Sequence, residues 1–178
     1  MATTKWVLDP THSEVQFKVK HMMISTVTGQ FMKFDATAET EEEDFTKAKV
    51  SVTVDADSIT TNNEQRDGHM RSPEFFDPAK FPHITFVATK VEKVGNDGSF
   101  EVYGDLTIRD VTKSVKLDTE FGGIAKDPWG NIRAGFTVTG KINRKEFGLV
   151  WHAVTETGGI VLSDEVRIHV GLEFIKQA

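Results

Sequence analysis

Cysteine is absent from the 178 residues of the chain. Disulfide bonds, thiolate nucleophiles and cysteine-ligated zinc sites are therefore excluded. No apolar run approaches the roughly 20 residues of a membrane-spanning helix, so we expect no integral membrane segment. The opening residues MATTKW also lack the basic region and apolar stretch of a secretory signal peptide. We therefore expect a cytoplasmic protein, or a periplasmic one if a leader has been removed.

Tyrosine and clustered positive charge are scarce as well. A single Tyr accompanies 13 Phe, so the aromatic content is almost entirely apolar and suits either a large core or the wall of an apolar cavity. Lys and Arg are scattered among acidic residues, and the formal net charge is -6. Because nucleic-acid binding needs clustered cations that neutralise phosphates, we expect no nucleic-acid partner. Composition leaves open whether the protein forms a homodimer.

The dominant pattern is alternation of apolar and polar residues, which is typical of half-buried β-strands. The clearest run lies near the C-terminus, where apolar residues alternate with polar ones from Val166 to Phe174. Similar runs cover residues 15–19, 50–54, 84–88, 100–108, 115–117 and 136–138. With the segments at Trp6 and Phe31–Ala38, they give roughly eight strands, more than a single open sheet needs.

Short connections indicate that these strands are antiparallel. Gly95–Gly98, of sequence GNDG, predicts a hairpin, and Asp127–Asn131 predicts a turn. Parallel strands would need crossovers of a dozen or more residues. We expect the acidic run Glu39–Asp44 to form an exposed loop. The five prolines all lie outside the alternating runs, so no strand carries a proline that marks a sheet edge, which favours a closed barrel over an open sandwich.

One segment departs from the strand pattern. Thr61-x-x-Glu64 matches a helix capping box, and residues 65–71 can continue as two helical turns until Ser72-Pro73 ends them. Phe75, Phe76 and Phe81 follow in a loop bounded by prolines. We therefore predict an all-β fold, a closed extended antiparallel β-barrel, with a short helix after the fourth strand. The helix and the aromatic loop would cap one end.

Motifs distributed along the chain resemble the YceI-like family of lipocalin-type polyisoprenoid-binding proteins. They begin with WVLDPTHS at residues 6–13, followed by Val15-x-Phe17 and His21. The later matches are Gly29-x-Phe31-x-x-Phe34, Asp57-Ser58-Ile59-x-Thr61, Arg66-Asp67-x-His69-Met70, Phe75-Phe76-Asp77, Phe81-Pro82-x-Ile84-x-Phe86, Gly104-x-Leu106-Thr107-Ile108-Arg109, Arg144-x-x-Phe147-Gly148-Leu149 and Asp164-x-Val166. Met70 stands where the family often has Leu, and many relatives carry a leader.

The resemblance implies a single lipocalin-like domain over residues 1–178 whose pore holds a polyisoprenoid or another long-chain lipid. Small barrels commonly have filled cores, so alternation alone does not separate a core from a cavity. The resemblance favours a cavity. The candidate wall residues are Phe17, Val19, Phe31, Phe34, Ile84, Phe86, Phe100, Leu106, Phe136, Ile142 and Phe147.

Three polar residues are candidates for the rim of such a pore or for contact with a ligand headgroup. His21 shares its odd-numbered face with Phe17 and Val19, which makes it either a core histidine or a group at the pore mouth. Arg66 and His69 lie three residues apart on the predicted helix and either pin it to the barrel or recognise a headgroup.

Aromatic residues near the expected pore end are candidates for a lid. Phe75 and Phe76 lie in the proline-bounded loop, and Trp151 lies in the irregular stretch Gly148–Ser163, whose glycines suit a hinge. An ordinary long loop accounts for that stretch equally well.

Neither a metal site nor catalytic machinery is indicated. His12 and His21 have an odd spacing that would point them to opposite faces of one strand, and zinc needs three or four converging ligands. Ser13 beside His12 is no catalytic pair, and no Gly-x-Ser-x-Gly or nucleotide-binding motif occurs. We expect no cofactor and no enzyme activity.

The hypothesis is a protein that binds a hydrophobic small molecule, a long-chain apolar lipid, for transport, storage or sequestration. One alternative is an enzyme acting on a bound apolar chain, with His21 or His69 as general base. Another is an interaction module with a filled core.

Overall fold

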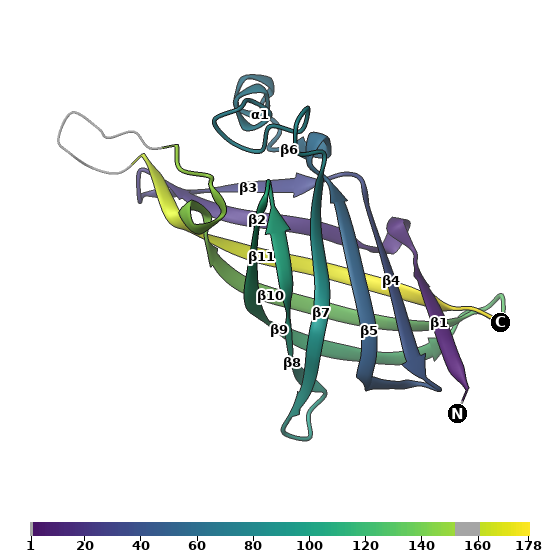
Figure 1. Ribbon diagram of the computed structural model, residues 1–178. Coiled ribbons are helices and arrows are strands. Elements are labelled where there is room, and N and C mark those ends of the chain that lie inside the picture. The colour runs from purple at the N-terminus through teal and green to yellow at the C-terminus, as the bar shows by residue number, and fades with distance from the viewer. Residues whose placement is uncertain (1, 152–160) are drawn as a thin grey trace.

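The computed structural model describes residues 2–151 and 161–178, in which eleven strands form one antiparallel sheet (Figure 1). The strands are β1 (Thr3–Leu8), β2 (Glu14–His21), β3 (Ser25–Phe31), β4 (Phe34–Glu41), β5 (Asp44–Asp55), β6 (Ile59–Thr60), β7 (His83–Val94), β8 (Ser99–Ile108), β9 (Val111–Lys126), β10 (Ile132–Asn143) and β11 (Leu162–Lys176). Between them lie helix α1 (Glu64–Met70) and the 3-10 helices η1 (Pro10–His12), η2 (Ala56–Ser58) and η3 (Arg144–Phe147). In this part of the chain no helix is long and apolar enough to cross a membrane.

The sheet closes on itself, which confirms the predicted barrel. β11 pairs with β10 along one edge and with both β2 and β1, end to end, along the other. The pairs β1/β2, β3/β4 and β5/β6 each act as one long strand interrupted by a break, so the barrel has eight long strands connected in sequence order. Closure gives each long strand a hydrogen-bonded neighbour on both sides.

The helix is present, but its surroundings differ from the sequence prediction. It follows β6 rather than a fourth strand, because Ser25–Phe31 and Ile59–Thr60 form strands that alternation did not reveal. Asn63, not Thr61, is the N-cap, and its side chain accepts a hydrogen bond from the backbone N–H of Arg66. Alternation missed β6 because two residues are too few to display a period.

The acidic run 39–44 is also not a loop. β4 continues to Glu41 and β5 begins at Asp44, which leaves a two-residue turn. Trp6 helps to hold this turn in place. Its indole N–H donates to the Thr40 hydroxyl at 2.9 Å, and that hydroxyl donates to the Glu42 carbonyl in the turn at 2.6 Å. The predicted turns at 95–98 and 127–131 are confirmed between β7 and β8 and between β9 and β10.

Helix α1 and η3 lie at one end of the barrel, here called the α1 end (Figure 1). The buried Asp67 carboxylate accepts hydrogen bonds from the Thr61 backbone N–H and hydroxyl, at 2.7 and 2.5 Å. Burial alone raises the pKa of Asp67, but these hydrogen bonds hold it below its usual value. Arg71 donates to the carbonyls of Asp57 and Ile59, so the helix is tied to η2 and β6.

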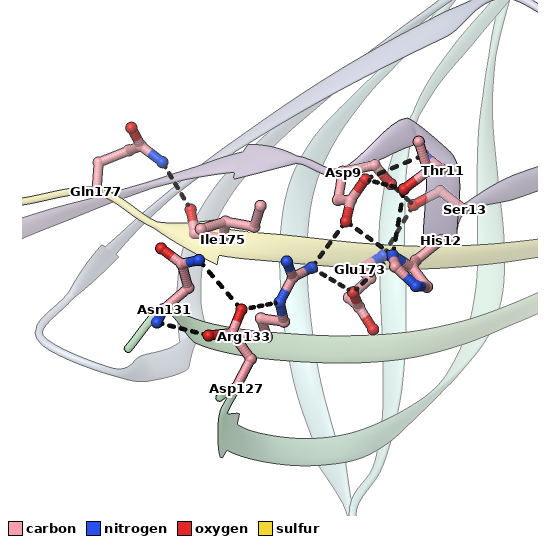
Figure 2. Close-up of polar contacts among 10 residues, drawn as sticks. All are labelled: Asp9, Thr11, His12, Ser13, Asp127, Asn131, Arg133, Glu173, Ile175 and Gln177. Atoms are coloured by element: carbon pink, nitrogen blue, oxygen red, sulfur yellow. Dashed lines mark hydrogen bonds and ion pairs between the residues drawn. The ribbon is translucent and has the colours of Figure 1, made fainter. Parts of the chain in front are cut away.

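An ionic network centred on Arg133 ties together segments at the other end (Figure 2). Its guanidinium donates to carboxylates of Asp9 and Glu173 at 2.7 Å each and of Asp127 at 2.8 Å. These bonds connect the β1–η1 junction, β11 and the β9–β10 turn. Asp9, His12 and Glu173 hold ligand-type atoms within 4.8 Å of one another. Arg133 donates to the carboxylates of both Asp9 and Glu173, so hydrogen bonds within the fold already engage these two members of the cluster.

Arg133→Met should make the protein less stable above about pH 4. It should also make the melting temperature depend less on pH in the acid range. Asp127 has its pKa lowered to about 2, chiefly by Arg133, and hydrogen bonds from Thr11 and then Arg133 hold the pKa of Asp9 well below its usual range. A carboxylate with a depressed pKa stabilises the fold above its unfolded pKa, and that contribution is lost as pH falls through the folded value.

Thermal unfolding from pH 7 to pH 2 tests this expectation. The melting temperatures of wild type and Arg133→Met should differ most above pH 4 and converge towards pH 2. A difference that stays constant over that range would show that Arg133 acts through packing rather than through its charge.

Candidate functional site

The barrel encloses an apolar cavity of about 240 Å³ between two clusters of buried side chains. Within the described residues, the polar members of its lining are Gln16, Thr85, Thr119 and Arg144. Nine of the predicted wall residues line it, namely Phe17, Val19, Phe31, Ile84, Phe86, Phe100, Leu106, Phe136 and Ile142. Alternation places them inward because successive strand side chains point to opposite faces of the sheet.

Two predicted wall residues lie outside the cavity lining. Phe34 follows the break between β3 and β4, and it packs as a partly buried side chain against both core clusters. Phe147 belongs to η3 rather than to a strand, so strand alternation does not govern its direction. It is fully buried in the cluster at the α1 end. Both residues therefore pack with the buried side chains that surround the cavity.

Glycines on the strands give the large inward rings their space. An added Cβ at Gly29 would lie 2.2 Å from the ring of Phe17 on the neighbouring strand. At Gly104 it would lie 2.5 Å from both the Phe86 ring and the Val87 carbonyl. The two rings therefore lie directly against the sheet, which leaves room in the interior. Both glycines stand in the sequence motifs, but their role was visible only from the cross-strand register.

Aromatic rings crowd the cavity at the end opposite α1. Phe45 contacts Trp6, Phe121 and Phe136 with ring centroids 5.0, 5.8 and 4.9 Å apart. Phe136 also lies 6.1 Å from Phe174. The sequence prediction missed Phe45 because it is out of phase with the other inward residues of β5 and borders the acidic run.

The Thr119 hydroxyl is an isolated polar group in this apolar wall. The residue is 8% exposed, and its Oγ1 has no hydrogen-bond partner. Its strand neighbours are Phe100 and Val138, both of which line the cavity. An unpaired buried hydroxyl costs about 1–3 kcal/mol. Thr119 is therefore one position where the wall can donate a hydrogen bond to an oxygen on a bound molecule.

Arg144 is a buried charged residue of the lining. Its guanidinium donates hydrogen bonds to backbone carbonyls. Nε donates to the Ser163 carbonyl at 2.9 Å, Nη1 to those of Leu149 and Trp151 at 2.7 Å each, and Nη2 to that of Leu162 at 3.2 Å. Nη2 also lies 3.7 Å from Asp164. Burial lowers the pKa of Arg144, and the charge of Asp164 opposes this shift. Arg144 thus ties residues 149–151 to the start of β11, and four of its five N–H donors are engaged by backbone carbonyls.

The predicted rim residues do not converge on the cavity. His21 is the last residue of β2, where it is exposed at the end of the barrel and does not line the cavity. Arg66 donates to the hydroxyl and carbonyl of Thr61, both at 2.7 Å. Arg66 therefore stabilises the start of α1 locally, and Arg71 makes the bonds to the barrel.

The aromatic residues predicted as a lid gather at the α1 end. Phe75 and Phe76 are buried and line the cavity. Trp151 packs against Phe75 at 5.6 Å, and the His69 ring lies edge-on to both at 4.9 and 5.2 Å. The Glu74 carboxylate lies 2.7 Å from His69 Nε2 and orients that ring. Residues 152–160 of the predicted lid lie outside the described residues.

Comparisons with known proteins agree with this architecture. The sequence model of the YceI-like domain matches residues 6–174. A UPF0312 protein of Staphylococcus aureus (strain USA300) is 38% identical over 172 residues, which cover 96% of this chain and 97% of the relative. The crystal structure of a Campylobacter jejuni YCEI protein has 33% identity and a TM-score of 0.75, and the match covers 89% of this chain and 90% of that one.

A polyisoprenoid binding domain from Saccharophagus degradans, implicated in plant cell wall breakdown, has the same fold. Its TM-score is 0.69 at 17% identity, and the match covers 97% of this chain and 98% of that one. The match to the family model and the identity to full-length relatives lead to one conclusion: this chain belongs to the YceI-like domain family.

Proposed function

We propose that the barrel binds a long-chain apolar lipid, a polyisoprenoid or a similar chain, in its interior for transport, storage or sequestration. The observation that carries this proposal is the cavity of about 240 Å³ with an almost wholly apolar lining. Apolar cavities of about 150 Å³ already stay dry and take up small apolar molecules. A larger apolar space inside a barrel is therefore a site for hydrocarbon rather than for water.

Burial of the chain supplies the binding free energy in this proposal. Each buried methylene contributes about 0.8 kcal/mol, whereas association costs on the order of 4–15 kcal/mol. Several isoprene units are needed to offset that cost, which favours a long chain. The solved Saccharophagus degradans domain, described as polyisoprenoid binding, shares the barrel and supports this ligand class.

The alternative functions have weaker support from the same geometry. A filled-core interaction module does not account for the cavity. An enzyme would need a base that reaches the bound chain, but neither His21 nor His69 lines the cavity. Organic extraction of the purified protein separates the two cases. A co-purifying apolar molecule supports binding, and its turnover by protein stripped of lipid would support an enzyme.

A series of prenyl ligands tests the proposed function. With a common headgroup, thermal stabilisation should rise as isoprene units are added and should level off once the chain outgrows the cavity. A ligand at about 100 times its dissociation constant adds roughly 2.7 kcal/mol, which raises the melting temperature of a domain of this size by several degrees.

The same series should be prepared with alcohol, phosphate and quinone heads. Changing the head at fixed length should matter less than changing the length, because the lining is almost wholly apolar and its charged residue Arg144 already donates to four backbone carbonyls. If the head has the larger influence, recognition lies in polar contacts and not in the apolar wall.

A further inference from the structure

The turn between β2 and β3 exposes three consecutive large apolar side chains. Met22 is 42% exposed, Met23 58% and Ile24 83%. Val150 is 60% exposed in the segment that Arg144 ties to β11. Single exposed apolar residues are normal on protein surfaces, but a contiguous group marks an interaction site.

The backbone of this turn is unfavourable for the residues that occupy it. Met22 and Met23 have φ values of 53° and 59°, and the Ile24 N–H donates to the His21 carbonyl at 3.2 Å. A positive φ at both central positions is the requirement of a type I′ hairpin turn, which strongly prefers Asn-Gly. Two methionines at these positions make the fold less stable than Asn-Gly would. The stability of the fold therefore does not account for the apolar side chains of this turn.

The turn lies at the α1 end, beside the cavity lining. Met22 donates its backbone N–H to the Val161 carbonyl at 2.7 Å, and His21 pairs in register with Leu162, which lines the cavity. Figure 1 shows the β2–β3 turn and η3 at the same side of the barrel. The exposed apolar tip is therefore next to the residues that close this end of the cavity.

We infer that the Met22–Ile24 turn docks the α1 end of the barrel onto an uncharged lipid surface. A projecting tip of three side chains can enter the boundary between headgroups and acyl chains, where apolar burial supplies the attraction. It is too small for a stable protein interface, which buries about 800 Å² on each partner. The net charge of -6 also disfavours both an anionic membrane and a second copy of the chain.

The inference rests on the proposed function for its purpose, because a lipid ligand that is insoluble in water enters and leaves through a lipid phase. Docking at the α1 end would bring that phase next to the cavity. The docking itself is a separate property, and it is measured on vesicles that contain no ligand.

The test is flotation of the protein with neutral phosphatidylcholine vesicles. The variant Met22→Asn/Met23→Gly/Ile24→Ser installs the preferred turn sequence and removes the apolar tip. Its partition coefficient should fall at least tenfold, which corresponds to about 1.4 kcal/mol, while its melting temperature stays equal or rises. Anionic vesicles should bind the wild type no better than neutral ones.

Trp129→Ser is the matched control, because Trp129 is 81% exposed in the turn at the opposite end. It should leave vesicle binding unchanged. The inference is overturned if the wild type does not float, if the turn variant floats equally well, or if Trp129→Ser lowers flotation as much. It is also overturned if sedimentation shows that the wild type is a dimer and the turn variant is a monomer, and the wild-type dimer does not float with the vesicles.

A thermal shift with farnesol supplied from solution separates this inference from the proposed function. The turn variant should be stabilised as much as the wild type, because its cavity is intact. If farnesol stabilises neither protein, the proposed function loses support, and flotation still decides whether the turn docks.

Discussion

Arg144→Met should lower the free energy of unfolding by about 4 kcal/mol, because removing one partner of a buried charged network costs about 3–5 kcal/mol. The side chain is 2% exposed. Its loss would leave the carbonyls of Leu149, Trp151, Leu162 and Ser163 without their donor. For a domain of this size the melting temperature should fall by about 10 °C, measured by circular dichroism.

Lys145→Met is the matched control for this substitution. Lys145 is the next residue and makes a single partly exposed ion pair with Asp164 at 3.3 Å. Such pairs contribute about 0–1 kcal/mol, so this variant should unfold close to wild type. Arg144→Lys should recover little stability, because an ammonium lacks the planar fork that serves four carbonyls. Equal effects of the Met variants would contradict the assigned role.

Alternation along the strands predicted which side chains face the interior, whereas the positions of the prolines favoured a closed barrel and the family resemblance favoured a cavity. A period of two fixes which side chains share a face, and in a closed barrel one face must be the interior. Phe86 and Phe136 were placed correctly for that reason. Phe34 and His21 were predicted at the pore but do not line it, because Phe34 is the first residue of β4 and His21 is the last residue of β2.

The residues that organise the cavity ends could not be found in this way. Arg144 binds carbonyls up to 19 residues away, and a contact of that kind leaves no local pattern. Arg133 likewise joins Asp9 across 124 residues. The positive φ at Met22 and Met23 runs against the usual turn signals, which rely on Asn and Gly. Residues 22–24 therefore carry no sequence signal of a turn.

Phe136→Asp should abolish ligand retention, because an unpaired carboxylate in an apolar interior is strongly disfavoured. The ring of Phe136 lies among Phe45, Phe121 and Phe174 and lines the cavity. The same result is expected for Phe86→Asp. Thr137→Asp is the matched control, since Thr137 is the exposed neighbour on the outer face of β10. Native mass spectrometry after equilibration with a long-chain prenol reports retention, and circular dichroism reports folding.

A buried charge can also unfold the barrel, so an uncharged variant completes this experiment. Ala48→Phe adds a ring at a position that lines the cavity. Overpacking costs about 1–3 kcal/mol, which leaves a typical domain folded. The folded variant should lose the prenol because the ring occupies the space of the chain, with the largest loss for the longest prenols. A folded Ala48→Phe or Phe136→Asp protein that retains prenol as the wild type does would place the ligand outside the barrel.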